Sequence, residues 1–302
     1  MRTLSKIFSV SFLVFFGWEF SAAQVNNNNN NNTNNNNQSN ILGPKNLPRD
    51  AAYDHQDASQ RRVVPPAYMR ASDIMWEERV WRVIDTRQKI NEQLYYPVQK
   101  NLNRISLYDL LKQALVAGEL TAYSFNAVDW DDYSEPLTLT EVKAKLSSVD
   151  TIPDENGNMK AVVNDITSDK IRGYMLKEDW HFEKQRSVID PRILWICPQV
   201  VTINKNTQQE DPTAGNTNLF WLYFPDLRPL LAKTPVFNQE NDAQWLSLDD
   251  IFWKRQFASY IVQQSNVFNR SIEAYMKGLD ALAEGNKIHD KIQAIENDMW
   301  QY

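Results

Sequence analysis

Three apolar stretches in the middle of the chain decide the fold: Ile171-Arg172-Gly173-Tyr174-Met175-Leu176, the run Arg192-Ile193-Leu194-Trp195-Ile196-Cys197 that continues to Ile203, and Leu219-Phe220-Trp221-Leu222. They are rich in Ile, Val, Trp, Tyr and Phe, the residues that β-strands favour. The polar stretch 204–218, which contains Pro212 and Gly215, separates the last two and predicts a hairpin loop. We therefore expect an antiparallel sheet at the centre of the chain.

Helical patterns lie on both sides of this predicted sheet. Before it, Ser72 could cap a helix over 73–84, because Trp76, Val80 and Ile84 recur at a spacing of four. Further predicted elements are a helix from Ser106 to Gly118, a short strand over 121–125, a helix over 140–146, a long helix from Ser247 to about Met276 and a terminal helix over 286–302. The fold class is therefore α+β, an antiparallel sheet with flanking N- and C-terminal helices.

Two pairs of segments suggest a faint internal duplication. Residues 78–85 resemble 183–190, and residues 137–142 resemble 246–251. The folded region 65–302 would then hold two related halves, 65–150 and 165–278, followed by the helix 286–302. The alternative is coincidence between common helix-capping patterns.

The first 64 residues precede the folded region. Arg2, Lys6, an apolar run of about a dozen residues and Ser21-Ala22-Ala23 predict a cleavable signal peptide over 1–23, because a membrane span needs about 20 apolar residues. Residues 24–64 are rich in asparagine and broken by prolines, a composition that predicts a disordered arm. We expect the mature chain to be exported and to touch a membrane only through partner proteins.

Composition argues against several functions. A net charge of −6 gives the chain no electrostatic reason to bind nucleic acid. The sequence lacks a Gly-x-Ser-x-Gly elbow, a His-Glu-x-x-His motif and a glycine-rich phosphate loop. His181 with Glu183 and the acidic run 129–135 are read as structural or solvated groups, and Cys197 as a buried apolar side chain. We expect no enzyme activity, no cofactor and no metal.

Contact surfaces remain as the candidate function. Ten tryptophans suit a protein interface or a sugar-binding platform, although any single Trp is more often part of the core. The terminal helix carries an apolar stripe that could dock on a neighbouring subunit or pack on its own domain. Its members are Ile288, Ile292, Ile295 and Met299. A secreted glycan- or peptidoglycan-binding protein is the alternative reading.

Several short motifs resemble the gliding motility protein GldN family, called PorN in bacteria that do not glide. They are Pro65-Pro66-Ala67-Tyr68-Met69-Arg70, Asp73-Ile74-Met75-Trp76, Val80-Trp81-Arg82-Val83-Ile84-Asp85, Leu94-Tyr95-Tyr96-Pro97, Ser106 to Leu111, Leu137-Thr138, Asp190-Pro191-Arg192, Tyr223-Phe224-Pro225-Asp226-Leu227-Arg228, Asp249-Asp250-Ile251-Phe252 and Arg255. The resemblance covers about 65 to 275 and leaves out the asparagine-rich arm.

The resemblance implies a non-enzymatic subunit of the type IX secretion and gliding machinery. Its relatives lie in the periplasm, at the inner face of the outer membrane, in rings with the lipoprotein GldK (PorK). They also contact the periplasmic part of the motor subunit GldM (PorM). A self-associating ring needs two different complementary faces. We expect one around Tyr68, Trp76 and Trp81 and the other on the terminal stripe. Asp150-Thr151-Ile152 also resembles the O-glycosylation signal of these bacteria.

Overall fold

The computed structural model describes residues 61–302 except for 102–103, 125–134, 154–158, 203–214, 239–240, 242–243 and 300–302. The signal peptide, almost all of the asparagine-rich arm and residues 129–134 of the acidic run lie outside the described residues. The predictions for these segments therefore stay predictions.

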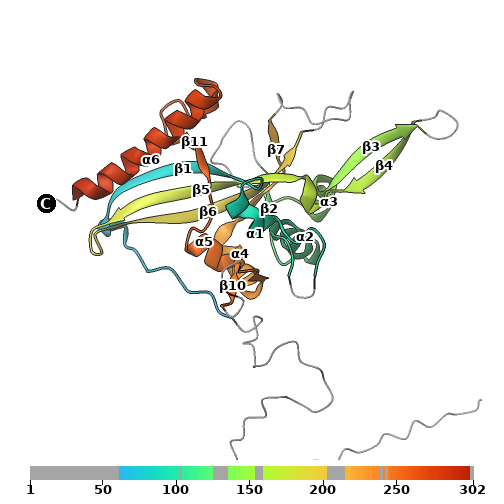
Figure 1. Ribbon diagram of the computed structural model, residues 1–302, viewed down its shortest axis with the longest axis horizontal. Helices are drawn as coiled ribbons and strands as arrows, with labels where there is room; N and C mark the ends of the chain where they lie inside the picture. The colour runs from blue at the N-terminus through green and yellow to red at the C-terminus, as the bar shows by residue number, and fades with distance from the viewer. Residues whose placement is uncertain are drawn as a thin grey trace, which may run out of the picture. The chain divides into compact units, whose positions relative to one another are not determined.

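An antiparallel sheet forms the centre of the described structure (Figure 1). Its strand order is β11-β1-β5-β6-β8-β2. The short strand β7 also pairs with β6, at residues 199–201, after the part of β6 that pairs with β8. The strands are β1 (Ile74–Asp85), β2 (Ala122–Tyr123), β5 (Ile171–Glu183), β6 (Val188–Val201), β7 (Asn216–Asn218), β8 (Trp221–Tyr223) and β11 (Tyr260–Gln264). Two small hairpin-like pairs lie outside it, β3 (Ser147–Pro153, which holds Thr151) with β4 (Met159–Asp165), and β9 (Pro235–Val236) with β10 (Leu246–Ser247). The predicted central strands are confirmed. The predicted loop 204–218 lies outside the described residues as far as 214, and its residues 216–218 form β7, which pairs with β6.

The helices are α1 (Glu92–Tyr95), α2 (Leu107–Ala117), α3 (Leu139–Leu146), α4 (Phe224–Lys233), α5 (Leu248–Trp253) and α6 (Leu279–Met299). Ser106 caps α2, and Gly118 ends it in the left-handed conformation, as the sequence predicts. The α+β class with a mostly antiparallel sheet is therefore confirmed. Within the described ranges, no helix combines the length and the apolar character that a membrane span requires.

The predicted helix over 73–84 is wrong, because this segment is strand β1. Trp76, Val80 and Ile84 are four residues apart, and an even spacing also places side chains on one face of a strand. The side chains between these positions distinguish a strand from a helix. Trp81 and Val83 are buried as well, on the opposite face, so the segment is apolar on both sides, as in a central strand rather than an amphipathic helix.

The predicted long helix from Ser247 to Met276 is also wrong, since α5 ends at Trp253. Arg255 has a φ of 52°, a left-handed conformation that stops the helix. The chain then enters β11, which pairs with β1 at the edge of the sheet. Gly278 directly precedes α6 with a φ of 60°. The terminal helix begins at Leu279 rather than at 286.

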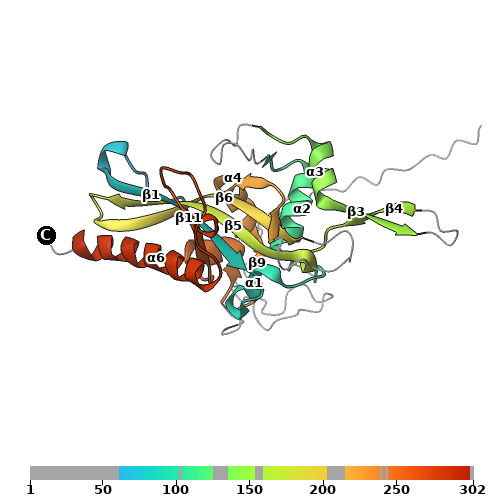
Figure 2. The ribbon, with the colours of Figure 1, turned by 90° about the horizontal axis from the view of Figure 1, so that it is seen from above.

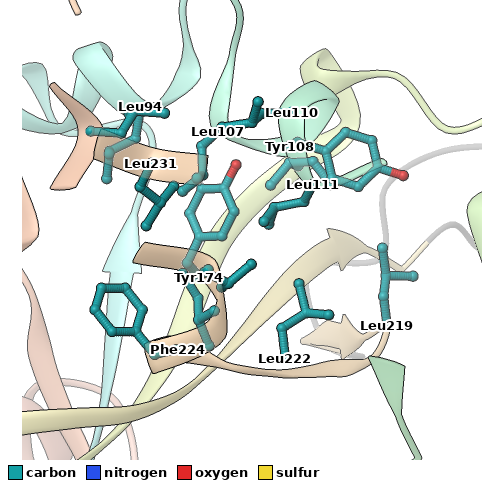
Figure 3. Close-up of a cluster of buried hydrophobic side chains, with 14 of the residues drawn as sticks. Leu94, Leu107, Tyr108, Leu110, Leu111, Tyr174, Leu219, Leu222, Phe224 and Leu231 are labelled. Atoms are coloured by element: carbon teal, nitrogen blue, oxygen red, sulfur yellow. The ribbon is translucent and has the colours of Figure 1, made fainter. Parts of the chain in front are cut away.

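The main core lies on one face of the sheet. Tyr174 of β5 projects among leucines of α2 and residues of β8 and α4 (Figure 3). The α6 helix packs on the same face nearer the β11 edge, where Ile288 and Ile292 contact Val80 (Figures 1 and 2). A smaller cluster on the opposite face contains Trp81, Cys197 and Trp221. Burial raises the pKa of the Cys197 thiol to about 12, which confirms its reading as a buried apolar side chain rather than a nucleophile.

Of the two pairs of segments that suggest a duplication, one pair adopts two different kinds of structure and the other pair adopts the same kind. Residues 78–85 lie in β1, whereas 183–190 span the turn from β5 to β6. Residues 137–142 and 246–251 both begin a helix with a capping box, formed by Thr138 and by Ser247. Strands from both suggested halves share the central sheet, and the division at 65–150 and 165–278 stays a prediction.

Gly285 offers a test of how closely α6 approaches β11. A Cβ atom at this position would lie 2.7 Å from the backbone oxygen of Ile261. Alanine normally favours a helix by about 1 kcal/mol over glycine. We expect Gly285→Ala instead to lower the free energy of unfolding by about 1 kcal/mol or more, because the overpacked contact outweighs propensity. Denaturant unfolding followed by circular dichroism measures the change.

The exposed neighbour provides the control for this variant. Asn286→Ala has no such contact and should raise the free energy of unfolding by about 0.5 kcal/mol through helix propensity. Equal stabilisation by both substitutions would contradict the close packing of α6 on β11.

Candidate functional site

An apolar groove of about 690 Å³ lies between the N-terminal segment and the surface formed by β6, α4 and α5. Val63, Pro65, Pro66 and Met69 form one wall. The rest of the lining comes from Asp190, Pro191, Arg192, Ile193, Leu194, Phe224, Pro225, Arg228, Pro229, Asp249, Phe252, Trp253 and Arg255. Apolar surface with a few fixed polar groups is typical of a binding site.

One side of the groove is held by a buried ion pair between α4 and α5. Arg228 donates from Nε and Nη2 to both carboxylate oxygens of Asp249, at 2.9 and 3.0 Å. The two side chains are only 9% and 10% exposed. The capping box of Ser247 and Asp250 starts α5 and so places Asp249 in its first turn. Arg228 also lies 4.8 Å from the ring centroid of Trp253, so the pair orients an aromatic side chain that is half exposed at the groove.

A second ion pair joins the sheet to the end of α5. Glu178 of β5 is fully buried and accepts two hydrogen bonds of 3.0 Å from Arg255. Trp180 donates its Nε1–H to the same carboxylate at 3.0 Å, and the Arg255 guanidinium lies over the rings of Trp180 and Phe257. The charge of a buried carboxylate with this many donors is fully balanced, so the network holds Glu178, Trp180 and Arg255 in fixed relative positions.

A third pair ties the N-terminal segment to the sheet. Arg192 pairs with Asp190 at 2.8 Å and donates to the backbone oxygen of Ala67 at 3.1 Å. Arg61 reaches Asp250 at the start of α5, at 2.8 Å. These two contacts hold the segment 61–67 along the groove and keep the cavity preformed.

The arrangement favours binding over catalysis. Each carboxylate in the groove lining is engaged by an arginine, which leaves no free acid or base among these lining residues to move a proton. In the part of the chain that the structure describes, no three His, Cys, Asp or Glu side chains gather as they would around a metal ion. A preformed apolar groove with satisfied charges suits an apolar protein segment.

The predicted interface residues fall in different places. Tyr68 is 86% exposed and belongs to the segment along the groove, although it does not line the cavity. Trp76 is half-buried and packs against the cluster under α6, and Trp81 is buried on the opposite face beneath Lys177. The structure therefore does not bring these three together.

The terminal stripe faces the chain's own core. Ile288 and Ile292 are buried against β1 and β11, which is the second of the two readings of this helix. Ile295 is half-buried, and the Met299 side chain lies outside the described residues. A contact of this stripe with a partner stays a prediction.

Sequence reasoning missed the groove and its ion pairs. Glu178 and Arg255 are 77 residues apart, and Arg228 and Asp249 are 21 apart, so no local spacing links them. A signal was nevertheless present, because most of the lining belongs to the motifs that carry the family resemblance. These are Pro65, Pro66, Met69, Asp190, Pro191, Arg192, Phe224, Pro225, Arg228, Asp249, Phe252 and Arg255.

Comparison with protein families gives one match. Residues 69–301 match the family model described as gliding motility associated protein GldN. Comparison with curated proteins gives no match. The matched range contains nearly all of the described structure and most of the groove.

The buried carboxylate provides a test of the network. Glu178→Gln keeps the shape of the side chain but removes the buried negative charge that balances the partly buried Arg255. We expect the free energy of unfolding to fall by about 3–5 kcal/mol, the usual effect of breaking a buried pair. Denaturant unfolding measures it. Glu284→Gln breaks the exposed pair with Lys287 and should change stability by less than about 1 kcal/mol; similar losses for both would contradict a special role for Glu178.

His289 of α6 predicts a pH dependence. The centroid of its ring lies 6.3 Å from that of Trp180. Burial is the main cause that lowers the pKa of His289, and the positive charges of Arg82 and Arg255 lower it further. The negative charge of Asp290 acts in the opposite direction. The unfolded chain therefore binds more protons than the folded one below about pH 6.5. Stability should fall as the pH drops from about 6.5 towards 5.

His289→Gln should reduce this loss of stability, as measured by thermal melts across that range. His181 also has a pKa lowered by burial, so part of the acid effect should remain in the variant. An unchanged pH profile would show that His289 does not contribute.

Proposed function

The chain belongs to the GldN family of gliding motility associated proteins, and from this premise we propose that it is a non-enzymatic subunit of the type IX secretion and gliding machinery. In this proposal the exported chain lies in the periplasm, at the inner face of the outer membrane. It assembles in a ring with a GldK/PorK-like lipoprotein and contacts the periplasmic part of a GldM/PorM-like motor subunit.

One observation supports an assembly role: the motifs that resemble the family converge on a single apolar groove. Asp190 to Arg192, Phe224 to Arg228 and Asp249 to Arg255 come from three separate parts of the chain. Arg192 pairs with Asp190 and Arg228 with Asp249, whereas Arg255 pairs with Glu178 of β5. Apolar members such as Phe224, Pro225 and Phe252 line the cavity. A chain whose family-like motifs build a rigid apolar groove fits a protein that works by holding another polypeptide.

Trp253 is the side chain most suited to anchor a partner in this groove. It is half exposed, and the Arg228 guanidinium lies over its ring. Tryptophans that are ordered before binding lose little side-chain entropy and dominate many interfaces. We place the centre of the proposed interface at this residue.

Trp253→Ala tests the proposal in cells. Loss of such an anchor costs about 2 kcal/mol or more, or about thirtyfold in affinity. A tagged wild-type chain, purified from mildly solubilised envelopes, should bring the lipoprotein and the motor subunit in high-mass particles, identified by mass spectrometry. The Trp253→Ala chain should recover far less of them.

Tyr96→Ala is the matched control. Tyr96 is a similarly exposed aromatic residue that lies outside the groove lining, so its removal should leave recovery unchanged. If the wild-type chain instead elutes alone as a monomer and binds peptidoglycan fragments, the glycan-binding reading replaces the assembly reading.

A further inference from the structure

The loop 265–271, between β11 and the segment that leads into α6, carries the most exposed apolar side chain in the described structure. Val267 is 98% exposed, and the adjacent Phe268 is 74% exposed. Two neighbouring apolar side chains that project fully from a loop are unfavourable in water unless a partner covers them. We call Val267 and Phe268 the tip.

The tip is held in place by its own loop. Asn266 accepts hydrogen bonds from the backbone N–H groups of Phe268 and Arg270, and it donates to the backbone oxygens of Gln264 and Arg270. The Arg270 guanidinium lies 4.9 Å from the ring centroid of Phe268. Because the loop is already ordered, little conformational entropy is lost when the tip binds.

The groove of the same chain has the properties that the tip requires. It is apolar, preformed and about 690 Å³ in volume, which is enough to take two side chains. In Figure 1, β11 and the start of α6 lie above β1, whereas α4 and α5 lie below β6. In the sheet order, β1 and β5 separate β11, which leads into the tip, from β6, which lines the groove, so the tip lies away from the groove of its own chain.

The charges beside the two surfaces are also complementary. Arg270, next to the tip, is stacked on Phe268 and Tyr275, and no carboxylate pairs with it in the described structure. Asp226, next to Pro225 of the groove wall, is exposed and joins no ion pair among the described residues. An unpaired cation beside the tip and an unpaired carboxylate beside the groove would meet when the tip enters the groove.

We propose that the tip of one copy of this chain binds in the groove of a second copy. The contact is head to tail, because it joins two different surfaces. Each added copy leaves one tip and one groove free, so the contact generates a ring where the rotation closes. This inference rests on the proposed function and names the partner of its groove.

Site-directed cross-linking tests the contact. Cys197 is fully buried and stays unreactive, so new cysteines can be addressed selectively. One purified batch carries Val267→Cys, and the other carries Pro229→Cys in the groove. A short bismaleimide should link the mixture of the two batches into a dimer, and neither batch alone. The double variant should give a ladder of longer products, in the purified chain and in envelopes.

Charge reversal provides the second measurement. Arg270→Glu in the Val267→Cys batch should lower the cross-linked yield by about threefold, and Asp226→Lys in the Pro229→Cys batch should restore it. Lys277→Glu, an exposed cation near the start of α6, is the matched control and should leave the yield unchanged. Circular dichroism confirms that each variant is folded.

Three results would overturn the inference. The first is an absence of cross-links in both the mixture and the envelopes. The second is linkage of each batch to itself, which indicates a two-fold contact. The third is sedimentation with phosphatidylethanolamine–phosphatidylglycerol vesicles that is lost in Val267→Asp, which assigns the tip to a lipid surface. If the lipoprotein is still recovered with the chain in any of these cases, the proposed function stands and only the head-to-tail contact falls.

Discussion

The ion pair between Glu178 and Arg255 is the constraint on which the rest of the structure depends. The Glu178 carboxylate has no exposed surface, so its negative charge must be balanced by a positive group beside it. Arg255, just after the end of α5, provides that charge. Arg255 makes this contact from a left-handed conformation, which also stops the helix and turns the chain towards Phe257. The chain can then form β11 on the edge of β1, and β11 provides the surface on which α6 packs.

The same pair explains why the groove is a rigid surface. Glu178 fixes Arg255 from the sheet, Asp249 fixes Arg228 from α5, and Asp190 fixes Arg192 from β6. Each arginine is thereby held at the groove with its charge already satisfied. Binding in such a groove does not require desolvation of a free charge, and the apolar lining supplies the driving force. These features favour a polypeptide ligand over chemistry on a small substrate.

Sequence patterns predicted correctly those helices and strands that are determined by interactions between residues close in the sequence. The Ser106 cap and the Gly118 stop gave α2 correctly, and the β-branched and aromatic runs gave the central strands. The error at β1 arose because spacings of four fit both a helix and one face of a strand, and long-range pairing with β5 decided between them. At β11 the chain leaves the helix at Arg255 and pairs with β1, which no local pattern indicates. The groove depends on partners far apart in the sequence, 77 residues for Glu178 and Arg255 and 125 for Arg192 and Ala67, which spacing alone cannot identify.

The groove and the tip differ in what holds them, and this difference bears on how an assembly could evolve. The groove is built from long-range ion pairs that also stabilise the fold, so a change at Asp249 or Glu178 alters binding and folding together. The tip is held by hydrogen bonds of Asn266 within a single loop, and Val267 contributes almost no buried area. Substitutions at the tip can therefore change partner specificity at little cost in stability, whereas the groove must remain nearly constant for the chain to fold.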